Sequence, residues 1–552
     1  MTRKQLSVLI AGKPAGNLSQ EESGTLSFQY LRSYRGAPLS STMPLSTKTY
    51  RGKMVANYLW GLLPEDPAVR KGVAIDFDIS PNNPFALLGA IGLDCPGAVQ
   101  FCRRETDAFR EERLVPISDT EIAHRLSQDG IGRKGWTTEN ERWSLGGQQN
   151  KFALRRQDDR WYSCKGSAPT THILKSGVRG LSHQALNEYV CMSLASKLGI
   201  KTARVDYHKF EGEPAVIIER YDRKIEKGTV IRLHQEDLCQ ALNCPPSNKY
   251  TADGGPSCTD VIEFLASTKA TAKANVASFL QMLIFNYLIA ATDAHAKNHS
   301  IMLGEHDAHR LAPMYDVASI APYIDAKKWT VKPPKLAMSI GGENRIGRIS
   351  ANDFRKLVDQ CELERLGITA EGCIELTLVY AEAIPEKLAE TFDDLEHTES
   401  AEAAKELRAH GKAHQSALRD NKGKAASLKT HRPHPSGQDR AMRALLPLAG
   451  PGSGRDSAIC AMGRPFEAVF PPEPRTARPR KFWTSDESKR AGGAAPARRQ
   501  REYWRKSGMV ESARQRYRSI IVPQRLKGAI MGTTSATIRV EGSTKRAVCA
   551  IA

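Results

Sequence analysis

The first third of the chain alternates short strand-like and helix-like apolar segments. Residues 25–30 alternate apolar and polar side chains, which is typical of a strand with one buried face. Gly and Pro residues between the apolar segments predict tight turns. We therefore expect a small α/β domain over residues 1–135, with strands at 5–10 and 25–30, helices at 52–63 and 84–93, and another strand within 92–101.

The order of the elements changes after this domain. Residues 136–225 are predicted to form strands around one helix at 183–198, where apolar residues recur every fourth position and Gly199 follows as a left-handed cap. Residues 226–421 are mostly helical, with one apolar stripe along 276–291. Strands followed by helices predict two lobes of an α+β fold rather than an alternating βαβ sheet.

The composition changes near residue 421. The net charge of the chain is +19, but residues 422–552 hold 27 Lys and Arg against 9 Asp and Glu, so this basic tail accounts for +18. The residues before the tail are nearly neutral, so the total charge is no argument for nucleic-acid binding. The tail is rich in Arg, Ala, Pro and Gly and lacks a sustained apolar period, so we expect it to be disordered.

The cysteines and the apolar runs indicate the cellular compartment in which the protein resides. The 11 cysteines form no Cys-x-x-Cys pair, which indicates reduced thiols in a reducing cytoplasm. No apolar run reaches the roughly 20 residues of a membrane span, and the first residues have too short an apolar run for a signal peptide. We expect a soluble cytoplasmic protein that does not contact the membrane.

The most specific chemical pattern is Asp293 followed five positions later by Asn298. In the catalytic loop of kinases, an Asp at this spacing accepts or orients the substrate hydroxyl, and the Asn holds Mg²⁺. Asp316 follows an apolar strand, a polar turn and a second apolar step, a layout that would return it beside Asn298 as another oxygen ligand. The spacing alone arises by chance in a chain of this length. The position of this pattern between a long apolar helix and a strand favours a catalytic role for Asp293.

Three further features precede this loop in the order found in kinases. Gly146 and Gly147 open a strand, where small residues would let backbone N–H groups approach phosphates. Lys175 ends an apolar strand, as does the kinase lysine that contacts the α- and β-phosphates, and Glu188 on the next helix could pair with it. Taken singly, the first two features are better explained by a simple turn and a surface lysine on a strand end, and a solvated glutamate explains the third equally well.

The fourth feature is an apolar strand that runs into Glu219, Tyr221 and Asp222. It resembles the hinge between kinase lobes, where Tyr221 could flank the adenine and Asp222 could reach the ribose. A charged strand end is the simpler explanation. The order of all four features favours a kinase, but H-R-D and D-F-G motifs are missing, so the chain is not an ordinary eukaryotic-type kinase.

Together these motifs resemble the HipA family of bacterial serine/threonine protein kinases, the toxins of toxin–antitoxin modules. The resemblance runs from near residue 5 to about residue 420 and rests on GGQQNK, PTTHILK, ERYDR, QEDLCQ, KYTADGGP, TDAHAKN and MYDVAS. It implies a bilobal protein-kinase-like fold with a small N-terminal α/β domain, a mixed N-lobe over 136–225 and an all-α C-lobe over 226–421. It also implies ATP and Mg²⁺ as cofactors.

The resemblance assigns roles to residues. Asp293 would be the catalytic residue, Asn298 and Asp316 would hold Mg²⁺, and Ser144 would be an autophosphorylated, self-inactivating serine. Supporting residues would be Glu188, His295 and Lys297, and the ATP-binding residues would be Gly146, Gly147, Gln148, Lys151, Lys175, Glu219, Tyr221 and Asp222.

The resemblance also implies a target and partners. Family members phosphorylate an aminoacyl-tRNA synthetase, typically the glutamyl enzyme, which blocks translation and induces persistence. A HipB-like helix-turn-helix antitoxin that binds operator DNA restrains them. The chain departs from the family at Asn150, where the better-known relatives have Glu, and in its basic tail. Two alternatives stay open: a small-molecule or lipid kinase of related fold, and an inactive kinase-like co-repressor bound to DNA with its antitoxin.

Removal of residues 422–552 is expected to leave phosphoryl transfer intact, because this segment has too little patterned apolar surface to offset the entropy of ordering. The tail could be read-through sequence, or a nucleic-acid-binding arm whose Arg clusters alternate with aromatic residues such as Trp483 and Trp504. Target labelling from radioactive ATP should be compared for the full chain and a chain ending at 421. Loss of labelling would contradict the prediction, and retained labelling with loss of a salt-dependent affinity for DNA or RNA would identify an arm.

Overall fold

The computed structural model describes residues 4–109, 112–127, 140–149, 151–178, 180–305, 308–323, 334–396 and 400–408. Asn150 and the basic tail lie outside the described residues. Within these ranges, no helix is both long enough and apolar enough to cross a membrane. No disulfide joins the cysteines of the same ranges.

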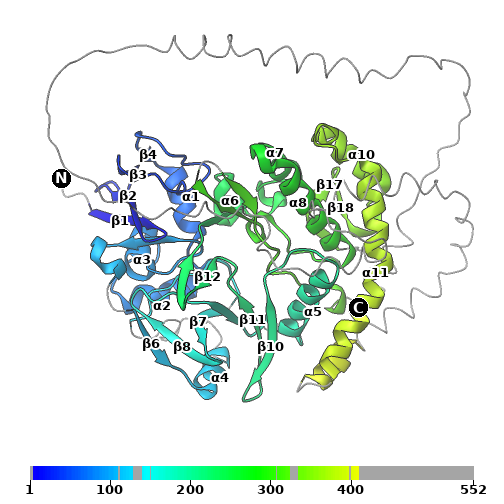
Figure 1. The fold of residues 1–552 in the computed structure, drawn as a ribbon, viewed down its shortest axis with the longest axis horizontal. Helices are drawn as coiled ribbons and strands as arrows, with labels where there is room; N and C mark the ends of the chain where they lie inside the picture. Colours follow the sequence, from blue (N-terminus) through cyan, green and yellow to red (C-terminus); the bar gives the residue numbers. More distant parts are fainter. Residues whose placement is uncertain are drawn as a thin grey trace, which may run out of the picture. The chain divides into compact units, whose positions relative to one another are not determined.

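The first sheet has five antiparallel strands in the order β4-β3-β2-β1-β5 (Figure 1). Its buried face packs on helices α1 and α3, with Val8, Phe28 and Leu59 in one core. Helices α2 and α3 each begin with Pro after a capping Asp66 or Asn83, whose side-chain oxygen accepts a backbone N–H bond. The predicted strands and helices are confirmed as β1 Lys4–Ile10, β3 Leu26–Tyr30, α1 Lys53–Gly61, α3 Pro84–Ile91 and β5 Val99–Cys102. Three further elements were not predicted: β2 Lys13–Gln20, β4 Tyr50–Arg51 and α2 Pro67–Asp76.

The second sheet has six strands in the order β10-β11-β9-β7-β8-β6. The alternating side chains of β11 cover both of its faces: Val216 and Ile218 join the core formed with α5 and the later helices, whereas Ala215 and Ile217 join a core with α4. The predicted helix at 183–198 is confirmed as α5. The elements are β6 Arg113–Pro116, α4 Asp119–Ser127, β7 Lys151–Gln157, β8 Arg160–Lys165, β9 His172–Lys175, α5 Gln184–Lys197, β10 Val205–Phe210 and β11 Glu213–Glu219.

The boundary of the first domain differs from the predicted one. Strand β6 pairs with β8, and α4 packs against the second sheet, so the first domain ends before Arg113 and not near residue 135. Pairing between strands that are about 50 residues apart leaves no mark in local periodicity. The left-handed backbone predicted after α5 is present, with φ of 78° at Gly199.

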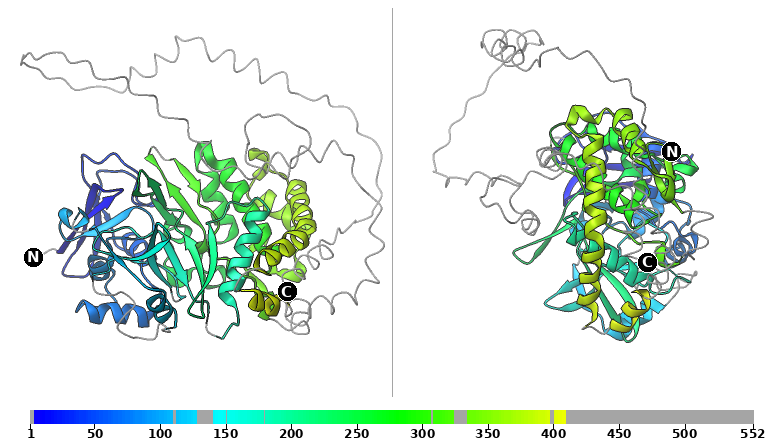
Figure 2. Two further views of the ribbon diagram at one scale, coloured as in Figure 1. Left: turned by 60° about the horizontal axis from the view of Figure 1, so that its bottom comes forward. Right: turned by 90° about the vertical axis from the view of Figure 1, so that its right-hand side faces the viewer.

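The later part of the chain is built around α8, which is buried along most of its length and packs against α7 and α11. Figure 2 shows α11 as a single long helix beside α5. The helices are α6 Leu238–Ala241, α7 Cys258–Ala266, α8 Ala272–Leu288, α10 Ala351–Gln360 and α11 Ala370–Glu396.

The prediction that 226–421 is all helical is wrong. Short strands form three small sheets in this part of the chain. Most of these strands have only three or four residues, too few for an alternating pattern to stand out. They are β12 Arg223–Glu226 with β13 Thr229–Arg232, β14 Gln235–Asp237 with β15 Ser300–Leu303 and β16 His309–Leu311, and β17 Lys335–Ile340 with β18 Glu343–Arg345.

A buried charge cluster ties the first domain to the second sheet. Asp94 is 1% exposed, and its carboxylate accepts hydrogen bonds from Arg223 (2.8 Å), Arg232 (3.0 Å) and Arg220 (3.2 Å). Asp222, directly after β11, accepts further bonds from Arg220 and Arg223. Burial alone would raise the pKa of Asp94, but the three guanidinium groups hold it well below its usual range.

The substitution Asp94→Ala is expected to lower the free energy of unfolding by about 3–5 kcal/mol, because Arg232 would lose its carboxylate partner and the buried Arg220 and Arg223 would keep only Asp222. Urea unfolding should show a lower midpoint with an unchanged slope. The control is Asp76→Ala, which removes an exposed carboxylate of the same domain and should cost less than about 0.5 kcal/mol. Equal midpoints for the two variants would contradict this role of the cluster.

Candidate active site

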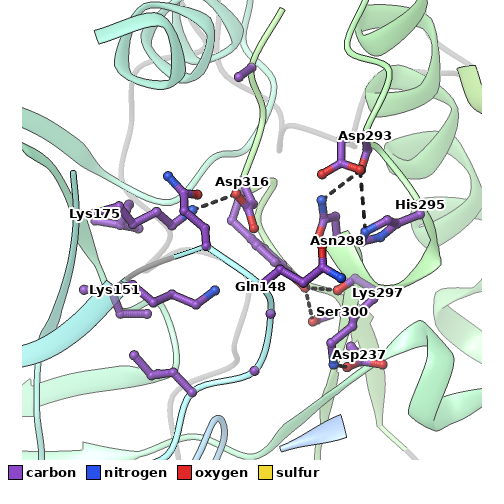
Figure 3. Close-up of a pocket in the computed structure, with 18 of the residues that line it drawn as sticks. Gln148, Lys151, Lys175, Asp237, Asp293, His295, Lys297, Asn298, Ser300 and Asp316 are labelled. Carbon is purple, nitrogen blue, oxygen red and sulfur yellow. Dashed lines mark hydrogen bonds and ion pairs between the residues drawn. The ribbon is translucent and has the colours of Figure 1, made fainter. Parts of the chain in front are cut away.

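A cavity of about 470 Å³ lies between the second sheet and the later helical part, a size within the range of nucleotide-sized sites. Figure 3 shows Lys151 and Lys175 entering it from one side and Asp293, His295 and Asn298 from the other. The predicted site residues that line it are Gly146, Gly147, Gln148, Lys151, Lys175, Glu219, Tyr221, Asp222, Asp293, His295, Lys297, Asn298 and Asp316. Ser144 and Glu188 do not line it.

Lys175 connects both sides of the cavity. It ends β9, and its Nζ donates hydrogen bonds of 2.7 Å to Glu188 on α5 and of 2.7 Å to Asp316. Burial would lower the pKa of Lys175, but the two carboxylates raise it above its usual range, so the ammonium stays charged. The predicted pairing of Lys175 with Glu188 is present in the structure.

Asp316 has an unusual backbone. Its φ of 59° lies in the left-handed region, where a residue with a side chain costs energy and where strain gathers at functional sites. Although burial opposes ionisation, Lys175 and Lys151 hold the pKa of Asp316 well below its usual range. The strained backbone therefore keeps an ionised carboxylate between two ammonium groups.

A second lysine reaches the cavity from the neighbouring strand. Lys151 on β7 stands opposite Lys175 in the antiparallel pairing with β9. Burial, with repulsion from Lys175, lowers the pKa of Lys151 to about 8 in spite of the nearby Asp316. Two ammonium groups on adjacent strands make this side of the cavity suited to an anion.

The loop before β7 needs glycine at both positions. A Cβ on Gly146 would lie 2.7 Å from the carbonyl oxygen of Gly61. Gly147 has a φ of 99°, and a Cβ there would lie 2.6 Å from Nζ of Lys151. Because these glycines allow the close approach of Gly61 and Lys151, they set the shape of the loop at the mouth of the cavity.

Asp293 lies five residues after α8, with its side chain 69% exposed toward the cavity. Its backbone carbonyl accepts 2.9 Å hydrogen bonds from the N–H of His295 and from Nδ2 of Asn298. The amide nitrogen of Asn298 is thereby engaged, so its amide oxygen is the atom left for a cation. The hydroxyl of Tyr250 donates to Oδ1 of Asp293.

His295 and Lys297 hold this loop through contacts with neighbouring segments of the chain. The ring of His295 meets the ring of Tyr250 edge-on, with 4.8 Å between centroids. Nζ of Lys297 donates to Asp237 at 2.7 Å and to the carbonyl of Gly61 at 2.9 Å. These contacts tie both residues to segments outside the loop, and their supporting role stays a prediction.

The residues predicted at an inter-lobe hinge, Glu219, Tyr221 and Asp222, have different surroundings. Tyr221 lines the cavity, donates to Gln235 and lies 5.7 Å from the ring of Tyr315. Glu219 points to an exposed ion pair with Arg204 at 3.6 Å. The carboxylate of Asp222 is buried in the arginine cluster described above, so the prediction that it reaches a ribose does not fit the structure. Neighbouring arginines take up its oxygens, and the sequence did not show that they converge there.

Ser144 is fully buried. Its hydroxyl donates to the carbonyl of Leu62 at 2.6 Å, and its N–H donates to the carbonyl of Asp94 at 3.0 Å. A phosphate has no room at this position in the described conformation. Modification of Ser144 therefore requires the loop to leave its place against the first domain.

Sequence reasoning missed the contribution of the first domain and of the KYTADGGP segment. Glu65 lines the cavity and pairs with Lys249 at 2.8 Å, and Tyr250 contacts Asp293. The KYTADGGP motif had been noted as part of a resemblance, without a role for its residues. No local signal pointed to Glu65, since its partner lies 184 positions away.

The lining fits ATP and Mg²⁺. Oε1 of Glu65 and Nδ1 of His295 are buried without a hydrogen-bond partner among the described residues, as expected of a cavity completed by a polar ligand. Across the described ranges, no group of three or more His, Cys, Asp and Glu could hold a metal. Mg²⁺ suits such a site, because it commonly takes one or two protein oxygens and completes its shell with phosphates and water.

Comparison with known proteins identifies the family to which the chain is similar. Models of the HipA N-terminal domain and the HipA-like C-terminal domain match residues 6–102 and 143–399. A putative kinase, Y4mE, from Sinorhizobium fredii is 30% identical over 71% of this chain and 94% of its own length. The serine/threonine-protein kinase toxin HipA of Shewanella oneidensis is 30% identical over 68% of this chain and 87% of its own.

A solved structure gives the same answer. The Shewanella oneidensis complex of HipA, HipB and operator DNA contains a chain that superposes with a TM-score of 0.62 and 27% identity, over 75% of this chain and 97% of that one. The chain therefore belongs to the HipA family of kinases.

Proposed function

We propose that the protein is an ATP- and Mg²⁺-dependent serine/threonine protein kinase, in which the second sheet and the later helices act as the two lobes. The observation that carries the proposal is the Lys175 ammonium held between Glu188 and Asp316, 2.7 Å from each, facing the loop with Asp293 and Asn298. Kinases require these groups together. Bound Mg²⁺–ATP would supply the phosphoryl group and neutralise its developing charge.

Each residue has a defined task in this proposal. Lys151 and Lys175 bind the phosphates as cations. Asn298 and Asp316 provide oxygen ligands for the cation. Asp293 orients the acceptor hydroxyl and takes its proton as that oxygen bonds to phosphorus and the bond to the leaving ADP breaks.

The target and partners of this chain extend the same proposal. The matched toxin acts as a serine/threonine kinase by name, and the matched structure holds HipA with HipB and operator DNA. We infer a cytoplasmic toxin that phosphorylates an aminoacyl-tRNA synthetase, the glutamyl enzyme first among them, and that a HipB-like antitoxin restrains at its operator. Such a kinase would block translation and induce persistence.

Radiolabelled ATP added with the purified chain to a bacterial lysate tests the activity and the target together. A labelled band identified as a synthetase supports the proposal. Label found only in small metabolites or lipids would favour a small-molecule kinase. A folded protein whose melting temperature does not respond to Mg²⁺–ATP, and which labels nothing, would be an inactive co-repressor.

The substitution Asp293→Ala should lower the labelling rate by at least ~10²-fold, because the group that orients the hydroxyl is lost. Stability and the Mg²⁺–ATP-induced rise in melting temperature should persist, since the phosphate and cation contacts remain. Asp359→Ala, which removes an exposed carboxylate of α10, serves as the control. Wild-type labelling by well-folded Asp293→Ala would overturn the assignment.

Ser144 should become phosphorylated when the active protein is incubated with Mg²⁺–ATP. A phosphate with about −1.5 to −2 charges cannot stay in the buried site beside the Leu62 carbonyl, so the glycine loop should leave the cavity and ATP binding should weaken. Mass spectrometry gives the modification, and melting temperature with Mg²⁺–ATP gives the weaker binding. A bare Ser144 in a protein that labels its target would contradict the prediction, and Asp293→Ala is the unmodified reference.

A further inference from the structure

The segment Gly61–Glu65, which follows α1 in the first domain, contacts both loops of the cavity. The carbonyl of Gly61 accepts the 2.9 Å bond from Lys297 of the catalytic loop. The N–H of Glu65 donates to the carbonyl of Gly147 at 3.0 Å in the glycine loop. The first domain therefore forms part of the wall of the site, next to the groups that would bind phosphate and the groups that would act on the hydroxyl.

The side chain of Glu65 extends this contact to a third segment. Its Oε2 accepts a 2.8 Å bond from Nζ of Lys249, and each of the two side chains is only 9% exposed. Loss of one partner from a buried pair is costly because the other charge is left without compensation. This pair therefore fixes Lys249 against the first domain.

Lys249 also contacts the residue that follows it, Tyr250. Its ammonium lies 5.6 Å from the centroid of the Tyr250 ring, within the range of a cation–π contact. The edge of the same ring meets His295, and its hydroxyl donates to Oδ1 of Asp293. Tyr250 is thus held by Lys249 on one side and by the catalytic loop on the other.

Asp293 depends on this contact for its orientation. Its side chain is 69% exposed, and the hydrogen bonds described above engage its backbone carbonyl and not its carboxylate. Burial, followed by the nearby Asp293, raises the pKa of Tyr250 above its usual range, so its hydroxyl stays protonated as a donor. Among the described residues, Tyr250 donates the hydrogen bond to the Asp293 carboxylate, and Nε2 of His295 lies farther away, 3.9 Å from the same Oδ1.

We propose that Tyr250 is a positioning residue for Asp293, and that the Glu65–Lys249 pair makes docking of the first domain a condition for this positioning. The inference rests on the proposed kinase activity and adds to it a control by the first domain. Through the chain Glu65, Lys249, Tyr250 and Asp293, the domain would act on the rate of phosphoryl transfer, and this path would leave the contacts of the phosphate-binding lysines unchanged.

The substitution Tyr250→Phe tests the first step. It keeps the ring on His295 and removes the hydroxyl, so the maximal rate of label transfer from Mg²⁺–ATP to the lysate acceptor should fall about tenfold, because the carboxylate loses its orientation. The ATP concentration at half-maximal rate should change less than about twofold, because the lysines and cation ligands are untouched. Tyr50→Phe is the control: it removes a hydroxyl that donates to the carbonyl of Pro44 on the exposed surface of the first domain.

The second step is tested with the pair. Glu65→Gln should lower the maximal rate in the wild-type background and have little further effect in Tyr250→Phe, because both changes act on one group. Glu21→Gln, which breaks an exposed ion pair with Arg51 in the same domain, should leave the rate unchanged. If Glu65→Gln unfolds, the double change Glu65→Gln/Lys249→Gln removes both charges and should give the same loss of rate in a folded protein.

The outcomes separate this inference from the proposed function. A wild-type protein that binds Mg²⁺–ATP but transfers no label would overturn the proposed kinase activity itself. With an active wild type, an unchanged rate for Tyr250→Phe overturns the positioning role. Rate losses of Glu65→Gln and Tyr250→Phe that multiply in the combined variant overturn the coupling to the first domain.

Discussion

The burial of Asp94 among three arginines is the constraint on which the rest of the structure depends. Asp94 lies in the turn before β5, whereas Arg220, Arg223 and Arg232 lie at the hinge and in the β12–β13 hairpin. Ion pairs this deep gain little net stability, because desolvation opposes the attraction. They instead penalise other arrangements of the first domain and the second sheet, because an arrangement that buries these groups without pairing them leaves uncompensated charges inside the protein.

This constraint accounts for how residues from separate parts of the chain come together in one site. Once Asp94 is docked, Trp143 and the loop with Ser144 lie against it, and Gly61–Glu65 meets both the glycine loop and Lys297. The two lysines then face Asp316 at close range. The sheet side of the cavity thereby presents two ammonium groups, and Glu188 and Asp316 balance their charge in the described structure.

The sequence predicted those parts of the site that depend on local pattern. The helix at 183–198, the strand that ends at Lys175, and the loop from Asp293 to Asn298 are each set by neighbours within a few positions, and the structure places them around one cavity. Glu188 reaches Lys175 because a strand, a short turn and a helix leave few other arrangements.

The failures have a common physical origin. Asp222 was predicted at the ribose because its segment resembles the inter-lobe hinge of kinases. Arg220 and Arg223, which also bind Asp94 far earlier in the chain, take up its carboxylate oxygens instead. Glu65, β6 and the pairing of β14 with β15 depend on partners far along the chain. Burial of such pairs is decided by three-dimensional docking, about which periodicity carries no information.

The span of the charge cluster bears on how the chain folds during its synthesis. The strands of the first sheet all lie within the first 102 residues, so this domain can form before the arginines that bind Asp94 have been synthesised. Arg232 follows Asp94 by 138 positions, which at ribosomal elongation rates of about 5–20 residues per second is a delay of roughly 7–28 seconds. Lys297 and Asp316 emerge later still. A nascent chain therefore carries a folded first domain but no assembled cavity, and a message cut short before these residues yields an inert product.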